Sequence, residues 1–361
     1  MHIVIRAGGI GTRLWPMSRQ NNPKQFQKVV GETSMVRATY ERIKELSNDA
    51  NKIFVSVNQQ MLENIKQELP EINISNIIIE TDTRNTGPAI CLEVCYLEKH
   101  CQPNEIIASL TSDDYISDAQ AFRELLQDSE QFLQQQPEHI LALSVAPSYP
   151  DTGYTYFKVG EKIDDVGNNA IYKVARVVEK PNVDLCKELL QSGEYYCHVG
   201  MYVWQLGYIS KLFQKLQSDM YQTCRKIVEL MEQNTDWQKI KDLYGNLEKI
   251  TIESAITDKA DSLAMSVSNR FGWSDLGKWH VLKRILSDEN ENLIKGEVLA
   301  HESEGNLVYN NNQGKVIALN DVRDLVVIDT GDVLLISSNK NSAEVKELVA
   351  KLKEQGKQEY L

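Results

Sequence analysis

The chain has 361 residues, of which 42% are hydrophobic and 25% are charged, and its formal net charge at pH 7 is −12. This length predicts a main domain with a smaller appendage, and the composition is typical of a soluble globular protein. The negative charge argues against nonspecific binding to nucleic acid or to an anionic membrane, since both need a broad basic surface.

The six cysteines favour a reducing compartment over a secreted, disulfide-bonded protein. They form no C-x-x-C pair, and the sequence shows neither a secretory leader nor an apolar run of membrane-spanning length. We therefore expect a cytoplasmic protein. Cys91, Cys95 and Cys101 recur at near-helical spacing in an apolar segment, which indicates small core side chains rather than a zinc site.

The chain opens with an apolar strand that runs directly into a glycine-rich turn. Glycines at positions 8, 9 and 11 remove the side chains that would keep a polyanion from the backbone N–H groups, and they permit φ > 0. The turn therefore predicts a triphosphate-binding loop. The glycine spacing is not the dinucleotide fingerprint, and no Lys-Ser/Thr follows to make a Walker A loop.

Two cations follow the glycines. Arg13 offers a bidentate guanidinium and Lys24 a mobile ammonium, and both could offset the charge that develops on a phosphorus centre during displacement. We predict that these two residues are catalytic.

Beyond the loop, helical and extended apolar spacings alternate. Helices are predicted near 35–46, 59–69, 88–101 and 119–134, and strands at 53–57, 76–80, 105–110 and 139–145. This alternation predicts an α/β fold with a doubly wound, mostly parallel, Rossmann-like sheet, whose ligand lies beyond the carboxyl ends of the strands.

The strand at 105–110 is followed by two neighbouring carboxylates. Mg²⁺ prefers oxygen ligands and usually takes one or two carboxylates together with substrate phosphates. Asp113 is therefore the first predicted metal ligand, whereas Asp114 either contacts metal as well or caps a turn.

The composition changes near residue 290. Helices are predicted within 207–249, but from 290 onward short β-prone runs are separated by Asn, Gly and Asp, and an amphipathic helix follows at 342–355. We expect a catalytic domain at 1–290 and a small β-helix-like module with a terminal helix at 291–361.

Two stretches carry a resemblance to a known family. Residues 7–26, AGGIGTRLWPMSRQNNPKQF, closely resemble the opening of the mannose-1-phosphate guanylyltransferases, which belong to the sugar-phosphate nucleotidyltransferase superfamily. GWSDLGKW at 272–279 resembles the family's GWSDVGSW. The resemblance implies a nucleotide-diphospho-sugar transferase fold, and it makes Asp275 the second Mg²⁺ ligand beside Asp113.

The same resemblance implies the nucleotide contacts. RNTGPAI at 84–90 is similar to a family string, RNTxPAI, that lies against the nucleotide, although the local pattern alone shows only a helix start with Thr86 as N-cap and does not say which base is read. The nucleotide-binding residues implied are Ala7, Gly8, Gly9, Gly11, Thr12, Arg84 and Asn85.

Three further strings resemble the family's sugar-phosphate site. DTGYTY at 151–156 and VEKP at 178–181 are similar to (E)TGYGYI and FxEKP, which implies that Lys180 meets the phosphate and Glu179 the sugar hydroxyls. CHVGMY at 197–202 stands where the family reads WNSGMF. There His198 is either a satisfied structural residue or a partner of a sugar hydroxyl. The sugar-phosphate contacts implied are Gly153, Tyr154, Glu179, Lys180, His198 and Gly200.

The activity implied is guanylyl transfer from GTP to mannose 1-phosphate, giving GDP-mannose and pyrophosphate with Mg²⁺. The alternatives are another sugar 1-phosphate or nucleoside triphosphate, and a non-catalytic paralogue that binds a nucleotide sugar and regulates a partner. We expect a homodimer and no nucleic-acid or membrane partner. Bifunctional members of the family add a cupin isomerase domain after the β-helical segment, and we expect none here.

Overall fold

The computed structural model describes residues 1–9, 14–47, 49–233, 236–288 and 290–361. The chain forms two compact units. Unit 1 comprises Met1–Gly8, Arg37–Ser112 and Ile116–Trp273, and unit 2 comprises Gly9–Val36, Asp113–Tyr115 and Ser274–Leu361.

Unit 1 is built on a nine-stranded sheet in the order β3-β2-β1-β4-β9-β6-β10-β8-β7. Its strands are β1 (His2–Arg6), β2 (Ile53–Asn58), β3 (Ile77–Glu80), β4 (Ile106–Thr111), β6 (Ile140–Val145), β7 (Thr155–Val166), β8 (Asn169–Glu179), β9 (Tyr195–Gln205) and β10 (Leu263–Val267). β1 is completely buried over Ile3–Ile5, which explains its continuous apolar run.

This sheet is mixed, and the expectation of a mostly parallel sheet is wrong. Strands β1 to β4 pair in parallel, as do β6 and β10. However, β9 runs antiparallel to both β4 and β6, and β7 and β8 form a long antiparallel hairpin. A strand at 171–178 is predicted by the sequence and appears as β8, but β7 was missed, because most of its residues are partly buried or exposed and it lacks the apolar run that marks the central strands.

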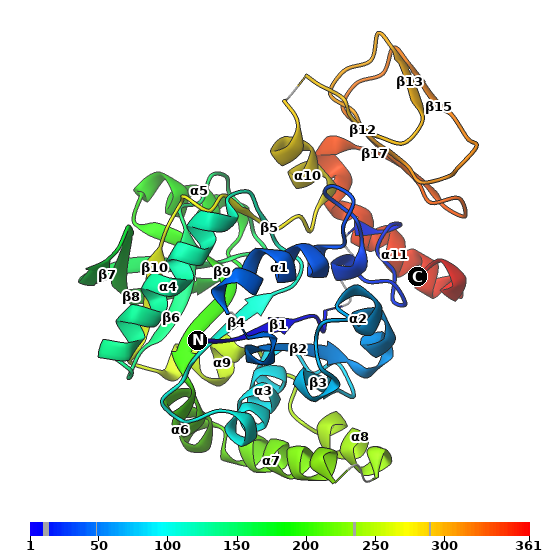
Figure 1. Ribbon diagram of the computed structural model, residues 1–361. Coiled ribbons are helices and arrows are strands. Elements are labelled where there is room, and N and C mark those ends of the chain that lie inside the picture. The colour runs from blue at the N-terminus through cyan, green and yellow to red at the C-terminus, as the bar shows by residue number, and fades with distance from the viewer. Residues whose placement is uncertain (10–13, 48, 234–235, 289) are drawn as a thin grey trace. The chain divides into compact units, whose positions relative to one another are not determined.

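Helices cover both faces of the sheet. They are α2 (Leu62–Glu68), α3 (Thr86–His100), α4 (Ala119–Gln135), α5 (Val183–Ser192), α6 (Leu206–Leu216), α7 (Ser218–Glu232), α8 (Trp237–Gly245) and α9 (Ile252–Ala255), and α1 (Met35–Ile43) follows the N-terminal segment. In Figure 1, α3, α6, α7 and α8 gather on one side, where they share a single apolar core with residues of β1 and β4. Cys91, Cys95 and Cys101 are buried core residues, as expected.

Unit 2 contains a β-rich module made of residues from the C-terminal part of the chain. Its strands are β12 (Leu293–Lys295), β13 (Val298–His301), β14 (Leu307–Asn310), β15 (Ile317–Asn320), β16 (Leu325–Asp329) and β17 (Leu334–Ser338). One sheet contains β12, β14 and β16 in parallel, followed by β17, which runs antiparallel to β16. A second sheet consists of the parallel strands β13 and β15. Val308, Leu319 and Val327 form its small core.

Two helices and a short ladder complete the described elements of this part. α10 (Trp279–Leu286) precedes the module and α11 (Val345–Glu354) follows it, with a 3-10 turn at Asn339–Glu344 where the predicted helix was expected to begin. A two-stranded ladder joins β5 (Tyr115–Ile116) to β11 (Trp273–Ser274). Across the described residues, no helix combines the length and apolar character needed to cross a membrane.

The segment after the glycine loop is fastened to the C-terminal part of unit 2. The indole of Trp15 donates to the Tyr360 carbonyl at 2.7 Å, and the indole of Trp279 donates to the Trp15 carbonyl at 3.1 Å. The buried Tyr309 hydroxyl donates to the Val29 carbonyl at 2.9 Å. Residues that are remote in sequence therefore hold the N-terminal segment in place.

Candidate active site

Three of the predicted site residues meet in unit 2. The ammonium of Lys24 lies 3.1 Å from a carboxylate oxygen of Asp113 and 3.1 Å from one of Asp275. The Lys24 side chain is only 3% exposed, whereas the carboxylates of Asp113 and Asp275 are 37% and 17% exposed. The carboxylates thus face a buried cation on one side and remain accessible to solvent on the other.

Local structure explains how these side chains are held. Asp113 follows the end of β4, and Asp275 follows β11, so both occupy loop positions directly after a strand. Lys24 lies in a 3-10 turn, Lys24–Phe26, that is buried throughout. A Cβ atom at Gly277 would lie 2.6 Å from an oxygen of Asp275, so the glycine is needed for the close approach of the chain.

The electrostatics of Lys24 favour its charged form. Burial by itself lowers the pKa of a lysine, but the charges of Asp113, Asp275 and Asp114 outweigh it and raise the pKa of Lys24 above its ordinary value. Asp114 is itself buried, with 6% exposure. Among the described residues, the cluster therefore places the positive charge of Lys24 beside three carboxyl groups.

This donor set fits a magnesium ion. Two carboxylates already converge on one cation, and they are partly open to solvent, where phosphate oxygens and water could complete the coordination that Mg²⁺ prefers. A second convergence of metal-binding side chains in the described residues consists of His2, Cys101 and Glu105. This group lies at the amino ends of β1 and β4. It is therefore at the opposite end of β1 from the glycine loop, which follows the carboxyl end of that strand.

The described part of the glycine loop is held by backbone contacts. The Ala7 N–H donates to the Ser56 carbonyl at 2.7 Å, and the side-chain amide of Gln25 donates to the Gly9 carbonyl at 2.8 Å. A Cβ atom at Gly8 would lie 2.7 Å from an oxygen of Glu80. Gly11, Thr12 and Arg13 lie outside the described residues.

The expected use of these glycines needs a correction. Neither Gly8 nor Gly9 adopts a φ between +20° and +160°. At Gly8 the close neighbour is instead the Glu80 carboxylate, which would have to shift to admit a Cβ atom.

Arg84 and Asn85 lie at the start of α3. Asn85, rather than the expected Thr86, is the N-cap, and its side-chain oxygen accepts from the Thr86 N–H at 2.9 Å. Asn85 can serve because an asparagine tolerates its φ of 71° better than most residues. The Arg84 guanidinium pairs with Asp82 at 2.8 Å and is about 29% exposed.

The three strings predicted to bind sugar phosphate come together in unit 1. Thr155 on β7 pairs with Glu179 on β8 and also with His198 on β9, so these residues form one row across three strands. The Lys180 N–H donates to the Tyr154 carbonyl at 3.0 Å, which joins the turn before β7 to the end of β8.

Within this group, Lys180 and Glu179 are the accessible charged residues. Their side chains are 59% and 36% exposed and are joined by a 2.9 Å ion pair. Lys180 adopts a φ of 42°, which turns the chain sharply at the strand end. The Gly153 N–H donates to the Asp151 carboxylate at 2.8 Å within the preceding turn.

His198 is buried, in contrast to this exposed pair. Its side chain is 3% exposed, its Nδ1 lies 3.2 Å from the Leu143 carbonyl oxygen, and its ring stacks on Phe157. Burial lowers the pKa of His198 to about 4, so the ring is neutral at pH 7. Its Nε2 has no hydrogen-bond partner, although Glu253 lies 3.9 Å away.

Sequence reasoning missed a set of polar residues around β1 in unit 1. Glu80 accepts from Ser56 and Tyr244, Glu93 accepts from Ser109, and Arg6 donates to the Gly200 carbonyl. A charged residue in an otherwise buried run was the available signal, since Glu93 lies among the buried apolar residues of α3 and Arg6 ends the apolar strand β1.

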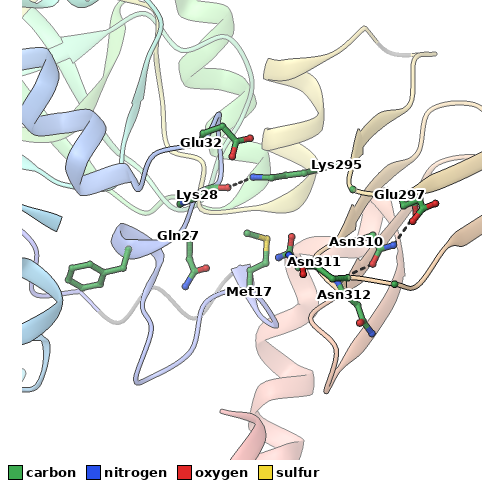
Figure 2. A pocket seen from close by; sticks show the side chains of 13 residues that line it. Met17, Gln27, Lys28, Glu32, Lys295, Glu297, Asn310, Asn311 and Asn312 are labelled. Atoms are coloured by element: carbon green, nitrogen blue, oxygen red, sulfur yellow. Dashed lines mark hydrogen bonds between the residues drawn. The ribbon is translucent and has the colours of Figure 1, made fainter. Parts of the chain in front are cut away.

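A groove of about 800 Å³ in unit 2 begins next to the Lys24 turn but does not include Lys24, Asp113 or Asp275. Figure 2 shows Gln27 and Met17 on one side and the asparagines at 310–312 on the other, with the Lys295 ammonium donating to the Lys28 carbonyl. The groove is polar, and we do not place the reaction in it because none of the converging charges faces it.

Comparison with known proteins identifies the family of the chain. Residues 2–292 match the family model described as nucleotidyl transferase, and residues 296–352 match the model described as MannoseP isomerase/GMP-like beta-helix domain. The crystal structure described as mannose-1-phosphate geranyltransferase from Thermus thermophilus superposes with a TM-score of 0.83 at 26% identity, covering 98% of this chain and 99% of that one.

Curated relatives give the same picture. Mannose-1-phosphate guanylyltransferase RfbM of Salmonella typhimurium is 32% identical over 99% of this chain and 73% of its own length. Mannose-1-phosphate guanylyltransferase of Klebsiella pneumoniae is also 32% identical, over 99% of this chain and 75% of its own length. The chain therefore belongs to the mannose-1-phosphate guanylyltransferase family of nucleotidyltransferases.

Proposed function

We propose that the protein transfers a guanylyl group from GTP to mannose 1-phosphate, giving GDP-mannose and pyrophosphate. The observation that carries the proposal is the convergence of Lys24, Asp113 and Asp275 in a chain of this family. A buried ammonium with two accessible carboxylates is suited to a reaction in which phosphate charge is neutralised and moved.

The reaction is an in-line displacement at the α-phosphorus of GTP. A phosphate oxygen of mannose 1-phosphate forms the new P–O bond, and the bond from the α-phosphorus to the bridging oxygen breaks as pyrophosphate leaves with its electron pair. The protein has little covalent chemistry to perform, so its residues position the two substrates and stabilise charge. Lys24 and Arg13 are assigned to the departing pyrophosphate and the developing charge.

Asp113 and Asp275 would hold the magnesium ion. Bound there, Mg²⁺ would neutralise phosphate oxygens and so make the α-phosphorus more electrophilic. The buried Lys24 ammonium lies 3.1 Å from an oxygen of each carboxylate, so it holds both side chains close to one another.

The sugar phosphate is assigned to the row that joins β8, β7 and β9. Lys180 would meet the phosphate and Glu179 the sugar hydroxyls, while Gly153, Tyr154 and Gly200 shape the backbone around them. The exposure of Lys180 and Glu179 supports a ligand-binding role. His198 is buried, and its Nδ1 is hydrogen-bonded to a backbone carbonyl. It would therefore either pack behind the sugar-binding residues or offer only its Nε2 to a sugar hydroxyl.

The nucleotide is assigned to Ala7, Gly8, Gly9, Gly11 and Thr12, with Arg84 and Asn85 near the base. We also propose a boundary between catalytic domain and β-rich module at about residue 290. The two family-model matches, which end at 292 and begin at 296, support that division.

A substrate panel tests the proposal. Pyrophosphate release would be measured with GTP, ATP, UTP, CTP and dTTP, each combined with mannose 1-phosphate or glucose 1-phosphate in the presence of Mg²⁺. The proposal predicts the highest kcat/KM for GTP with mannose 1-phosphate. A higher value for another pair would favour a different nucleotidyltransferase, and nucleotide-sugar binding without turnover for any pair would favour the regulatory paralogue.

A further inference from the structure

Arg6 is a charged residue that the assigned chemistry does not use. It is the last residue of β1, directly before Ala7 and Gly8, and it is only partly buried, unlike the four residues before it. Its guanidinium donates from Nη2 to the main-chain carbonyl of Gly200 on β9. This bond joins the strand that enters the nucleotide loop to a residue of the sugar-phosphate row.

The acceptor lies at an irregularity in β9. Residues 195–198 of β9 pair with β7, and residues 202–205 pair with β4. In the pairing with β6, the register shifts between His198 and Tyr202. Residues 199–201 of β9 therefore have no paired residue on β4, β6 or β7. Gly200 itself has a φ of 74°, as expected where a strand bulges.

A carbonyl that leaves the ladder at a bulge needs another donor, because a buried backbone oxygen without one costs free energy. Arg6 supplies that donor from a strand two positions away in the sheet, since β4 lies between β1 and β9. The contact therefore fixes both the direction of the bulge and its distance from the root of the nucleotide loop.

Two buried carboxyl groups, those of Glu80 and Glu93, have hydrogen-bond partners other than Arg6. Glu80 is bound by Ser56 at 3.1 Å and Tyr244 at 3.0 Å, and Glu93 is bound by Ser109 at 3.1 Å. Among the ion pairs between described residues, none joins Arg6 to either carboxylate within 4.0 Å. The hydrogen bond of the Arg6 guanidinium goes instead to the Gly200 carbonyl.

We propose that Arg6 is a positioning residue for guanylyl transfer: through Gly200 it sets the spacing between the nucleotide loop at residues 7–8 and the sugar-phosphate row at residues 198–200. This inference rests on the proposed function. In-line displacement requires the attacking oxygen and the α-phosphorus to be aligned, and a displacement of about 1 Å can cost on the order of 10²-fold in rate.

Replacing Arg6 by Met tests this role, because Met keeps much of the length but removes the donor. We expect kcat to fall by about 10- to 100-fold while KM for GTP and for mannose 1-phosphate each change by less than about threefold, since the binding contacts of each substrate remain. Arg6→Lys retains a donor and should recover at least part of kcat. Arg123→Met is the matched control, because Arg123 also donates to a main-chain carbonyl, at 3.1 Å, but belongs to α4 and binds Arg42.

A double-mutant cycle distinguishes a loss of kcat caused by the missing Arg6–Gly200 contact from a loss caused by general damage to the structure. A Cβ atom at Gly200 would meet only Thr111, at 3.5 Å, so Gly200→Ala strains the backbone without a severe clash. If the two residues act through one contact, Arg6→Met should add little to the loss of kcat caused by Gly200→Ala.

Three results would overturn the inference while wild-type activity remains: an unchanged kcat in Arg6→Met, a loss confined to the KM of one substrate, or fully additive effects in the cycle. Absence of activity in the wild-type protein would instead overturn the proposed function. If Arg6→Met does not fold, the same cycle is measured with Arg6→Lys in its place. The kcat values of Arg6→Lys, of Gly200→Ala and of the double variant are then compared.

Discussion

Among single residues, Lys24 is the cation that lies within 3.1 Å of both Asp113 and Asp275. Replacing it by Met removes a preorganised positive charge, so we expect kcat to fall by about 10²–10³-fold with the fold retained. Lys28→Met is the matched control, because Lys28 is exposed four residues later in the same segment. Pyrophosphate release under saturating substrates measures both variants, and near-normal turnover in Lys24→Met would remove Lys24 from the catalytic group.

The two carboxylates give a second prediction. Asp113→Asn and Asp275→Asn each remove one charged oxygen ligand, so both should raise the Mg²⁺ concentration needed for half-maximal activity. Asp184→Asn serves as control, since the Asp184 side chain is 90% exposed on α5. A Mg²⁺ titration of initial rates measures the effect. An unchanged Mg²⁺ requirement in either site variant would refute a two-carboxylate metal site.

The buried carboxyl group of Glu93 should make the stability of the folded protein depend on pH. Burial raises the pKa of Glu93 to about 7, with Arg6 opposing the shift and Glu80 adding to it. Between the ordinary pKa of 4.5 and about 7, the folded protein holds a proton that the unfolded chain has released, so this group's contribution to stability is lost as pH rises.

Glu93→Gln should therefore gain stability relative to the wild type as pH rises from 5 to 8, by on the order of 3 kcal/mol at most. Thermal unfolding of both proteins across that range measures the difference. A difference that stays constant with pH would show that Glu93 does not titrate in the folded protein.

Lys24 and Asp113 were predicted from local patterns, a cation after the glycine turn and a carboxylate after a strand, whereas Asp275 came from the family resemblance of residues 272–279. The structure brings the three side chains together. Arg6 and Glu93 were not chosen, because a residue within an apolar run reads as part of the core. Only the tertiary structure shows that Glu93 accepts a hydrogen bond from Ser109 and that Arg6 donates to the Gly200 carbonyl.

At the scale of elements, the start of α3 depends on a glycine. The Gly87 N–H donates to the Ile250 carbonyl at 2.9 Å, and a Cβ atom at Gly87 would lie 2.8 Å from that oxygen. Gly87→Ala should therefore destabilise the protein by about 1–3 kcal/mol, despite the higher helix propensity of alanine.

Gly245→Ala on α8 is the matched control, since a Cβ atom there meets nothing closer than 3.7 Å. That change should be neutral or stabilising by up to about 1 kcal/mol. Thermal unfolding of the two variants tests the contrast, and equal effects would mean that the contact at Ile250 does not restrict residue 87.

The elements themselves were predicted where the pattern is local. The helices near 88–101 and 119–134 appear as α3 and α4 with ends shifted by one or two residues, because a long apolar periodicity identifies a helix. Strand direction was not predictable in this way. The antiparallel insertion of β9 between β4 and β6 depends on pairing between residues about a hundred positions apart, which no local pattern records.

At the scale of the whole molecule, the C-terminal residues support the segment that carries Lys24. Ending the chain after Gly356 removes the Tyr360 carbonyl that accepts from Trp15, and it removes the buried Leu361. We expect a lower thermal midpoint and a reduced kcat, because the lost bond and burial together are worth about 2–4 kcal/mol.

Lys353→Ala is the control for this truncation, since Lys353 is exposed on α11. Differential scanning fluorimetry and the pyrophosphate assay measure both changes. Wild-type stability and turnover in the truncated protein would show that the C-terminal residues do not support the N-terminal segment.

We expect the chain to transfer the guanylyl group of GTP to mannose 1-phosphate at the group formed by Lys24, Asp113 and Asp275. The most direct measurement is chromatographic and mass-spectrometric detection of GDP-mannose formed by the purified protein, with Mg²⁺ and with EDTA, beside Lys24→Met. We predict GDP-mannose and equimolar pyrophosphate from the wild type with Mg²⁺, near-complete loss with EDTA, and formation slower by about a hundredfold or more in Lys24→Met. Absence of GDP-mannose from the folded wild-type protein, or formation at an equal rate by Lys24→Met, would contradict it.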